Sequence, residues 1–372
     1  MSDLGNLGQK IVVKIGSSLV TNEFNGLDQK SIYKIASQIS RLKQLKKEMV
    51  VVSSGAIAEG MMRLGFQNKP TPIHLLQACA AVGQMGLAQI YESSFAKFDL
   101  RTAQVLLTNS DLIDRERYLN ARTTIFTLLQ LGVIPIINEN DTVVTDEIKF
   151  GDNDTLGALV TNLIEADTLV ILTDQRGLYS SDPRVDPNAK FINDAFADDL
   201  KLEVMAGGPG SKLSTGGMLT KIQAARIASS SGANTFIADG RKKEVLIKLE
   251  EGIIICTQLK SKVEKKLSKK KWMTSHLKDN CHIVLNKLIS LKNENSISPD
   301  DAISLSGNFK RGDIISCINS SGETLALGIS NYSSSELKLI IKKQSSEIIK
   351  ILGYVEEVDL INSDNLFLIR AS

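Results

Sequence analysis

Short apolar runs alternate with segments of helical periodicity along the first 260 residues, and this alternation strongly constrains the fold. Continuous apolar runs are typical of strands buried on both faces of a parallel sheet. Between the runs, apolar residues recur at helical spacing, as in residues 28–47. Strands that alternate with helices predict a three-layer αβα sandwich with a mainly parallel sheet. The predicted strands are residues 11–15, 49–52, 103–108, 133–137, 168–172 and 235–238, and we expect the last of these to complete the sheet.

The pattern changes near residue 260. A lysine-rich run occupies residues 260–271, and short strands and turns follow it. We therefore predict an α/β domain over residues 1–260, a basic linker over 261–277 and a small β-rich domain over 278–362. The strands and turns expected in that domain are residues 282–291, 306–309, 312–315 and 325–329.

Composition excludes several classes of protein. Of the 372 residues, 42% are hydrophobic and 23% are charged, as in ordinary globular proteins, and the net charge of +2 neither favours nor excludes nucleic acid as a partner. The four cysteines and three histidines show no paired spacing, so we expect neither a disulfide framework nor a zinc site. The amino terminus is polar and no apolar run approaches the roughly 20 residues of a membrane span, which predicts a cytoplasmic location.

Polar side chains gather after the predicted strand at residues 133–137. Asn138-Glu139-Asn140-Asp141 follows it directly, and Gly151-Asp152-Asn153-Asp154 comes next. Either tetrapeptide alone is more typical of a solvated turn, in which Asn, Asp and Gly simply reverse the chain. Ligands of open α/β sheets bind beyond the carboxyl ends of the strands, so the two together predict a ligand site there.

Lysines and glycine turns add the ingredients of a phosphate site. Lys14 precedes the turn Gly16-Ser17, Ser53-Ser54-Gly55 ends a second strand, and a glycine turn opens the helix that contains Lys221. Such turns direct backbone N–H groups at anions, although a surface lysine and a flexible loop would give the same pattern. The Walker A and protein-kinase signatures are missing, and no histidine follows these strands to form a Ser-His-Asp triad. The lysines and glycine turns at the strand ends therefore favour phosphoryl transfer.

Taken together, these motifs resemble the amino-acid kinase family over nearly the whole chain. The motifs are Lys14-Ile15-Gly16-Ser17, Ser53 to Ile57, Asn138 to Asp141, Gly151 to Asp154, Thr173 to Tyr179, Asp182-Pro183-Arg184 and Thr215 to Met218. The carboxyl-terminal part resembles a PUA module, a small β fold also found in RNA-modifying enzymes. It departs from that pattern at Val284-Leu285-Asn286-Lys287, where relatives commonly carry an acidic, glycine-containing turn.

The resemblance implies transfer of the γ-phosphoryl group of ATP, with Mg²⁺, to the side-chain carboxylate of L-glutamate. The product would be glutamyl 5-phosphate, at the start of proline biosynthesis. The same resemblance implies feedback inhibition by L-proline, a homo-oligomer (dimer or tetramer) and a glutamyl-phosphate reductase as a partner. We expect Mg²⁺ to sit mainly on ATP oxygens and water, so no residue is assigned as a metal ligand.

The family's functional positions can be carried over residue by residue. Lys14, Lys221 and Asp154 match the catalytic positions, with the aspartate holding the two ammonium groups. The positions that match glutamate binding are Ser54, Gly55, Asn138, Asp141 and Asn153. Those that match ATP binding are Lys14, Gly16, Ser17, Thr173, Asp174, Thr215, Gly216, Gly217, Met218, Leu219, Thr220 and Lys221.

Two alternatives stay open from the sequence. One is a sibling kinase that phosphorylates aspartate, N-acetylglutamate, carbamate or a nucleotide. The other is an RNA-binding protein that acts through the PUA-like domain while the kinase-like domain is inactive. Binding that depends on phosphate contacts would weaken steeply with salt, which separates the second alternative from the enzymes.

Overall fold

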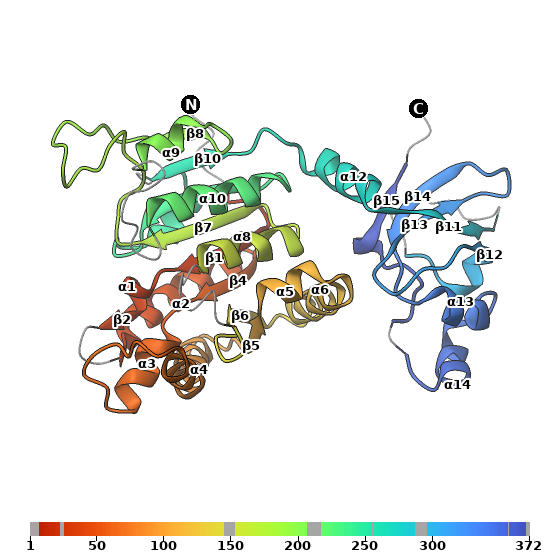
Figure 1. Cartoon of the computed structure of the whole chain (residues 1–372), viewed down its shortest axis with the longest axis horizontal. Helices are drawn as coiled ribbons and strands as arrows, with labels where there is room; N and C mark the ends of the chain where they lie inside the picture. The colour runs from red at the N-terminus through yellow and green to blue at the C-terminus, as the bar shows by residue number, and fades with distance from the viewer. Residues whose placement is uncertain are drawn as a thin grey trace. The chain divides into compact units, whose positions relative to one another are not determined.

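The computed structural model describes residues 7–22, 26–144, 153–206, 217–253, 256–286, 296–355 and 357–369. The chain divides into two compact units. The first comprises Met1–Ile113 and Asn120–Lys265, and the second comprises Asp114–Leu119 and Lys266–Ser372 (Figure 1). Each unit has its own sheet and its own hydrophobic core.

The first unit is built on an eight-stranded sheet with the strand order β5-β6-β4-β1-β7-β9-β10-β8. Neighbouring strands pair in parallel except β9 and β10, which are antiparallel. The predicted αβα sandwich with a mainly parallel sheet is therefore confirmed. The strands are β1 (Lys10–Ile15), β4 (Glu48–Ser53), β5 (Thr102–Leu107), β6 (Ile134–Glu139), β7 (Thr168–Thr173), β8 (Asp194–Phe196), β9 (Asn234–Asp239) and β10 (Thr257–Lys260).

The expectation that the sheet ends with the strand at residues 235–238 was wrong. Strands β8 and β10 extend it beyond β9, and β10 runs against β9. β8 has only three residues, none of them buried, and β10 reads Thr-Gln-Leu-Lys. Neither strand contains the apolar run by which buried parallel strands are recognised.

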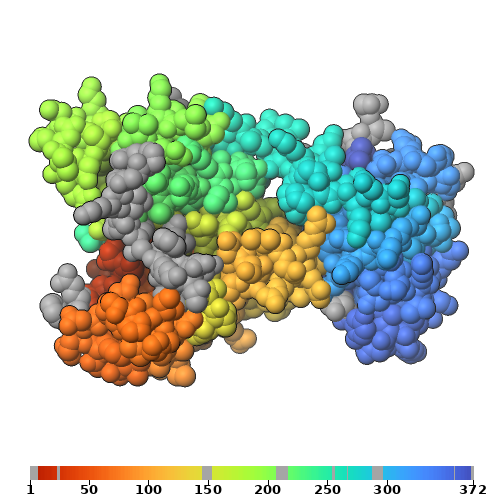
Figure 2. Space-filling view, in the orientation of Figure 1, coloured from red at the N-terminus to blue at the C-terminus, as the bar shows by residue number. Residues whose placement is uncertain are grey.

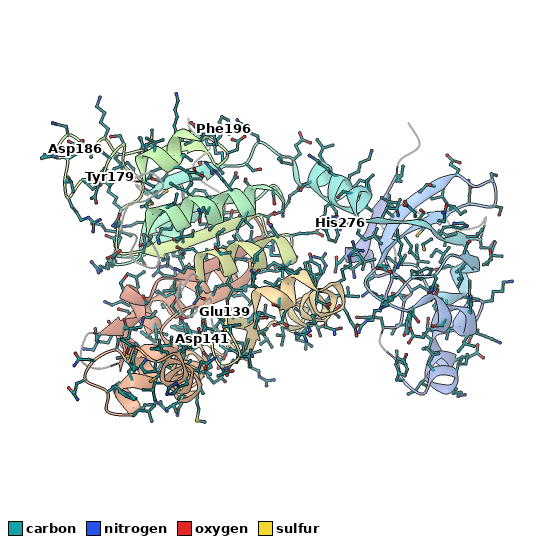
Figure 3. All side chains as sticks on the ribbon, viewed as in Figure 1. Glu139, Asp141, Tyr179, Asp186, Phe196 and His276 are labelled. Carbon is teal, nitrogen blue, oxygen red and sulfur yellow. The ribbon has the colours of Figure 1, made fainter. Side chains whose placement is uncertain are left out.

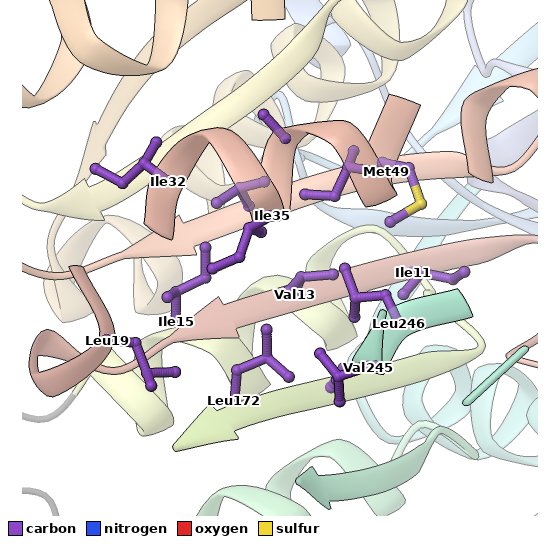
Figure 4. Packing of buried hydrophobic residues seen from close by; sticks show 14 of the residues in the cluster. Ile11, Val13, Ile15, Leu19, Ile32, Ile35, Met49, Leu172, Val245 and Leu246 are labelled. Atoms are coloured by element: carbon purple, nitrogen blue, oxygen red, sulfur yellow. The ribbon is translucent and has the colours of Figure 1, made fainter. Parts of the chain in front are cut away.

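Helices cover both faces of this sheet. α2 (Gln29–Gln44) begins at Asp28, whose carboxylate accepts hydrogen bonds from the N–H groups of Lys30 and Ser31. Its isoleucines pack with those of β1 and with α11 (Val245–Glu250) on one face (Figure 4). α8 (Asn153–Leu163) and α10 (Met218–Ser229) pack against each other and against β1, β7 and β9. The alternation of side chains along β1 puts Val13 and Ile15 toward α2 and Lys14 toward α8.

The remaining elements of the first part of the chain are short, apart from α4 and α6. Between β5 and β6 the chain forms two helices, α5 and α6, with a break between Ile113 and Arg115. The elements are α1 (Ser17–Val20), β2 (Thr21–Asn22), β3 (Gly26–Leu27), α3 (Ala56–Arg63), α4 (Ile73–Ala96), α5 (Asn109–Ile113), α6 (Arg115–Gln130) and α9 (Lys201–Met205).

Helix α4 packs against α3 with almost no space between the two backbones. A Cβ atom added to Gly83 would lie 1.8 Å from the carbonyl oxygen of Ala56, and one added to Gly60 would lie 1.7 Å from that of Cys79. Because these contacts are with backbone atoms, no side-chain movement could relieve them. The glycine-rich composition of α4 therefore sets the position of α3, which begins directly after Ser54-Gly55.

Among the described residues, α4 is also long and apolar enough to span a bilayer, with a mean hydropathy of 1.2 over 18 residues. The expectation that no apolar run approaches the length of a membrane span was therefore wrong, as judged by helix length and composition alone. Leu87, Tyr91 and Phe95 of α4 are fully buried in the core of the first unit. Core helices of this kind pass the same test, so the match is weak evidence for a membrane span.

The stretch between β7 and β8 projects from the surface of the first unit (Figure 2, yellow-green). Tyr179 forms an isolated β-bridge with Phe191, and their rings meet edge to face at 5.2 Å. Arg184 and Asp182 form an ion pair at 2.7 Å near the exposed end of the loop. This stretch is therefore a folded surface loop.

The second unit contains a five-stranded sheet with the order β12-β11-β13-β14-β15. Its core includes Ile283, Phe309, Cys317 and Tyr332. Residues 306–309, expected as a strand or a turn, leave the sheet: β12 ends at Ser306, Gly307 forms a bend, and Phe309 lies in neither a helix nor a strand. Residues 287–291 of another expected strand lie outside the described residues. The elements are α12 (Lys265–Ser275), β11 (Leu277–Leu285), β12 (Ala302–Ser306), β13 (Ile314–Ile318), β14 (Thr324–Ile329), α13 (Ser334–Ile340), α14 (Ile348–Leu352) and β15 (Leu366–Leu368).

Candidate active site

The carboxyl ends of β1, β4, β6 and β7 lie along one edge of the sheet. Ile15 is in register with Ser53 of β4 and with Leu172 of β7, and the N–H of Gly16 donates to the carbonyl of Leu172 at 3.0 Å. The residues that follow these strands are Gly16, Ser54, Asn140 and Asp174. Parallel pairing therefore brings the sequence motifs to the same edge.

Two lysines meet one aspartate between the sheet and helices α8 and α10. Nζ of Lys14 lies 2.5 Å from Oδ1 of Asp154, and Nζ of Lys221 lies 2.9 Å from Oδ2 of the same carboxylate. Asp154 is completely buried, and the lysines are 6% and 5% exposed. We call these three residues the Asp154 cluster; they are the three residues matched to catalytic positions.

Local structure explains how these groups come together. Asp154 lies in the first turn of α8, where the helix dipole favours a negative charge. One turn later, Gly157 faces β1, and a Cβ added there would lie 3.3 Å from Cβ of Lys14. A larger side chain at this position would force α8 away from the strand. The small residue therefore lets the helix lie close enough for Asp154 to reach Lys14.

The charge state of Asp154 follows from two opposing effects. Burial raises the pKa of its carboxyl, but attraction to Lys14 and Lys221 and hydrogen bonds from both outweigh this, so the pKa lies below its ordinary value. The hydroxyl of Thr220 also donates to Oδ2, at 3.1 Å. Asp154 is therefore ionised at neutral pH, and it carries one negative charge between two buried cations.

A hydrogen-bond network links the ends of β4 and β6 to the start of α8. Nδ2 of Asn153 donates to the carbonyl of Ser53 at 3.0 Å, to Oγ of Ser54 at 2.9 Å and to Oδ1 of Asn138 at 3.0 Å. Nδ2 of Asn138 donates to Oε1 of Gln84 at 2.8 Å. Three of the residues matched to glutamate binding, Ser54, Asn138 and Asn153, are therefore in direct contact.

The other two predicted glutamate-binding residues have different settings. Gly55 precedes α3 with φ +112°, which favours glycine, and a Cβ there would lie 2.9 Å from Cδ2 of Leu27. Asp141 follows β6 in a partly buried turn, and Figure 3 shows it beside Glu139. Tyr179 and Asp186, labelled in the same figure, belong to the projecting loop instead.

The residues matched to ATP binding fall into three groups. Gly16 and Ser17 lead into α1. Thr173 and Asp174 lie at the end of β7, where Nη2 of Arg241 is 3.9 Å from Oδ2 of Asp174. Gly217, Met218, Leu219 and Thr220 open α10. Thr215 and Gly216 lie outside the described residues, as do Gly151 and Asp152 of the second tetrapeptide.

Several residues of this site were missed from the sequence. Gln84 and Tyr91 lie one above the other on α4, and Tyr91 is hydrogen-bonded to Oγ of Ser53 at 2.8 Å. Neither belongs to a recognised motif. A polar residue on the buried face of an apolar helix, as Gln84 is, was the available signal. Gly157 carried no signal in the sequence, because its role depends on its contact with Lys14, 143 residues earlier in the chain.

Within the described residues, no group of three or more histidine, cysteine, aspartate or glutamate side chains is arranged to hold a metal ion.

Comparison with known proteins agrees with this geometry. Residues 9–239 match the profile of the amino acid kinase family, and residues 288–352 match that of the PUA domain. Because the first match spans more than half of its length, the chain belongs to the amino acid kinase family.

Curated relatives are similar over almost the whole chain. Glutamate 5-kinase of Herminiimonas arsenicoxydans and that of Janthinobacterium sp. (strain Marseille) are each 60% identical over 364 residues, covering 97% of this chain and 98% of the relative. Glutamate 5-kinase of Cupriavidus pinatubonensis (strain JMP 134 / LMG 1197) is 57% identical over 366 residues, with the same coverage.

Proposed function

We propose that the protein transfers the γ-phosphoryl group of ATP to the γ-carboxylate of L-glutamate, giving L-glutamyl 5-phosphate in the first step of proline biosynthesis. The structural observation that carries the proposal is the Asp154 cluster, two buried lysines on one carboxylate at the carboxyl edge of the sheet. The high identity to curated glutamate 5-kinases supports the choice of acceptor.

The reaction needs charge neutralisation more than it needs a base. The γ-carboxylate of glutamate is already ionised at neutral pH, because its ordinary pKa is about 4.3. The obstacle is repulsion between this anion and the phosphates of ATP. Lys14 and Lys221 would offset that repulsion as negative charge redistributes in the transition state, and Asp154 would keep both ammonium groups in place. Loss of either lysine would cost roughly 3–4 kcal/mol of transition-state stabilisation.

The acceptor would bind against Ser54, Gly55, Asn138, Asp141 and Asn153. Glutamate carries an α-ammonium group and two carboxylates, so its pocket needs both acceptors and donors. The carboxylate of Asp141 is suited to the ammonium group. The hydroxyl of Ser54 and the backbone N–H groups of the turn before α3 are suited to a carboxylate.

ATP would bind at the neighbouring strand ends. Gly16, Ser17, Thr173 and Asp174 would line this part of the site, together with the start of α10 from Gly217 to Lys221 and with Thr215 and Gly216. Magnesium would enter with the nucleotide and would neutralise part of the charge of its phosphates, and we assign no residue of this chain as its ligand.

Further proposals follow from membership of the family. We propose a cytoplasmic homo-oligomer, feedback inhibition by L-proline and delivery of the product to a glutamyl-phosphate reductase. We also propose that the kinase activity resides in residues 1–260, with 261–277 as a connector and 278–362 as the PUA-like domain. RNA binding by that domain stays an alternative that the assay below addresses.

The test is release of ADP by the purified protein with ATP and Mg²⁺. The candidate acceptors are L-glutamate, L-aspartate, N-acetylglutamate, carbamate and UMP, and Asp154→Ala is the inactive control. We expect turnover with glutamate alone. Turnover with another acceptor would assign the chain to a sibling activity. No turnover by folded protein would contradict a kinase, and salt-dependent RNA binding would then be measured.

A further inference from the structure

In the hydrogen-bond network at the glutamate-binding positions, it is defined which group of each side chain donates and which accepts. An amide nitrogen carries two hydrogens, and Nδ2 of Asn153 shares its hydrogens among Ser53, Ser54 and Asn138. Its donors are therefore fully used, and its Oδ1 is an acceptor. Because Oγ of Ser54 accepts from Asn153, the hydroxyl hydrogen of Ser54 points elsewhere as a donor.

The assignment of donors and acceptors depends on the orientation of the Asn138 side-chain amide. Asn138 presents Oδ1 to Asn153 and Nδ2 to Gln84. A half-turn of its amide would place an NH₂ group against the NH₂ group of Asn153, and two donors cannot bond to each other. Oε1 of Gln84, at 2.8 Å from Nδ2, is the acceptor that opposes this half-turn.

Gln84 itself is held in a rigid setting. Its side chain is 8% exposed, and the residue before it, Gly83, is in close contact with the backbone of α3. Two turns further along the same face of α4, Tyr91 is anchored to Ser53. The helix that carries Gln84 is therefore fixed against β4 and α3, the elements on either side of Ser54-Gly55.

We propose that Gln84 is a positioning residue that orients Asn138, and through it Asn153 and Ser54, so that the pocket offers an acceptor beside a donor. A donor and an acceptor side by side suit a zwitterion, which brings a carboxylate and an ammonium group. Gln84 thereby favours an α-amino acid over a plain dicarboxylic acid. This inference rests on the proposed function, because it concerns the glutamate pocket of that reaction.

The test compares L-glutamate with glutarate, which has the same carbon chain and both carboxylates but no ammonium group. The quantities are the KM for L-glutamate, the KM for ATP and the constant for competitive inhibition by glutarate. For Gln84→Met, we expect preference for glutamate over glutarate to fall about tenfold, the usual effect of one lost buried hydrogen bond. The KM for ATP should change by less than about twofold, since the nucleotide positions are not in this network.

Three further variants separate positioning from stability. Gln84→Glu keeps an accepting oxygen, so it should retain the preference for glutamate. Gln89→Met changes an exposed glutamine on the same helix and should behave as the wild type. Phe95→Leu trims a buried core side chain of the same helix that is not part of the hydrogen-bond network, so it should lower the thermal midpoint without changing the preference.

Three results would overturn the proposal. The first is a wild-type preference for glutamate retained in Gln84→Met. The second is a loss of glutamate and glutarate binding in equal proportion in that variant. The third is a loss of preference in Gln84→Glu as large as in Gln84→Met. Failure of the proposed function is a separate result, because the wild-type protein would then not phosphorylate glutamate at all.

Discussion

Replacing Asp154 by asparagine should damage both stability and catalysis, because one neutral amide would replace the shared counter-ion of two buried lysines. Asparagine has nearly the size of aspartate, so the change removes charge and leaves the packing. Lys14 and Lys221 are 6% and 5% exposed, and water cannot readily take the place of the carboxylate. Removing one partner of a buried ion pair typically costs about 3–5 kcal/mol.

The catalytic loss should be of a similar size. Without Asp154 the two ammonium groups repel each other, and neither is held at the position where negative charge develops. Loss of one preorganised group of this kind lowers kcat by roughly 10²–10³-fold. The assays are urea unfolding, analysed for the free energy of unfolding at constant m value, and steady-state release of ADP with glutamate.

Asp167 offers a matched control. It lies before β7, at the opposite edge of the sheet, accepts hydrogen bonds at 2.7 Å from the N–H groups of Gln9 and Lys10, and forms an ion pair with Lys265. Asp167→Asn should therefore lower stability while leaving kcat within about twofold of wild type, since it touches no part of the proposed site. An Asp154→Asn protein with wild-type kcat, or with less than about 1 kcal/mol of destabilisation, would refute the reasoning.

The difference in unfolding free energy between the wild type and Asp154→Asn should also depend on pH, and the sign of this dependence is defined. The pKa of Asp154 is lower in the folded protein than in the unfolded chain, so the cluster stabilises the fold above the unfolded value of about 3.9. This contribution is lost as the pH falls through the folded pKa. The difference in unfolding free energy between wild type and Asp154→Asn should therefore shrink below about pH 4.

Three other predictions concern packing and burial. Gly157→Ala should lower kcat several-fold and Gly157→Val more, because the added atoms press on Lys14; equal activity in both would contradict the close approach of α8. Gly83→Ala should lower the free energy of unfolding by about 3 kcal/mol, because its Cβ would meet the backbone of α3, whereas Ala81→Ser on the exposed face of α4 should change it little in the same urea titration. All four cysteines are buried, and burial raises the pKa of Cys256 to about 11, so a thiol reagent at pH 8 should react slowly until urea unfolds the protein; a fast-reacting thiol in the native state would contradict this burial.

The sequence predicted the parts of the fold that depend on local patterns. Buried strands such as β1 and β7 are continuous apolar runs, and α2 shows helical periodicity with an aspartate at its start. The strands β8 and β10 escaped prediction because they are short, and β10 is recognisable only by its pairing with β9. The apolar character of α4 was underestimated because glutamines and glycines interrupt its apolar residues, so that no continuous apolar run stands out in the sequence.

For the site, the sequence by itself determined which chemical groups are present and which family the chain belongs to. Lys14, Asp154 and Lys221 stand in recognisable motifs, so their importance could be stated without coordinates. Only the tertiary structure decided how they meet, because the contacts join residues 67 to 140 positions apart and depend on the small size of Gly157. The role of Gln84 was likewise decided by the fold: the direction of a hydrogen bond depends on which groups face each other, and an isolated glutamine in a helix does not specify its partner.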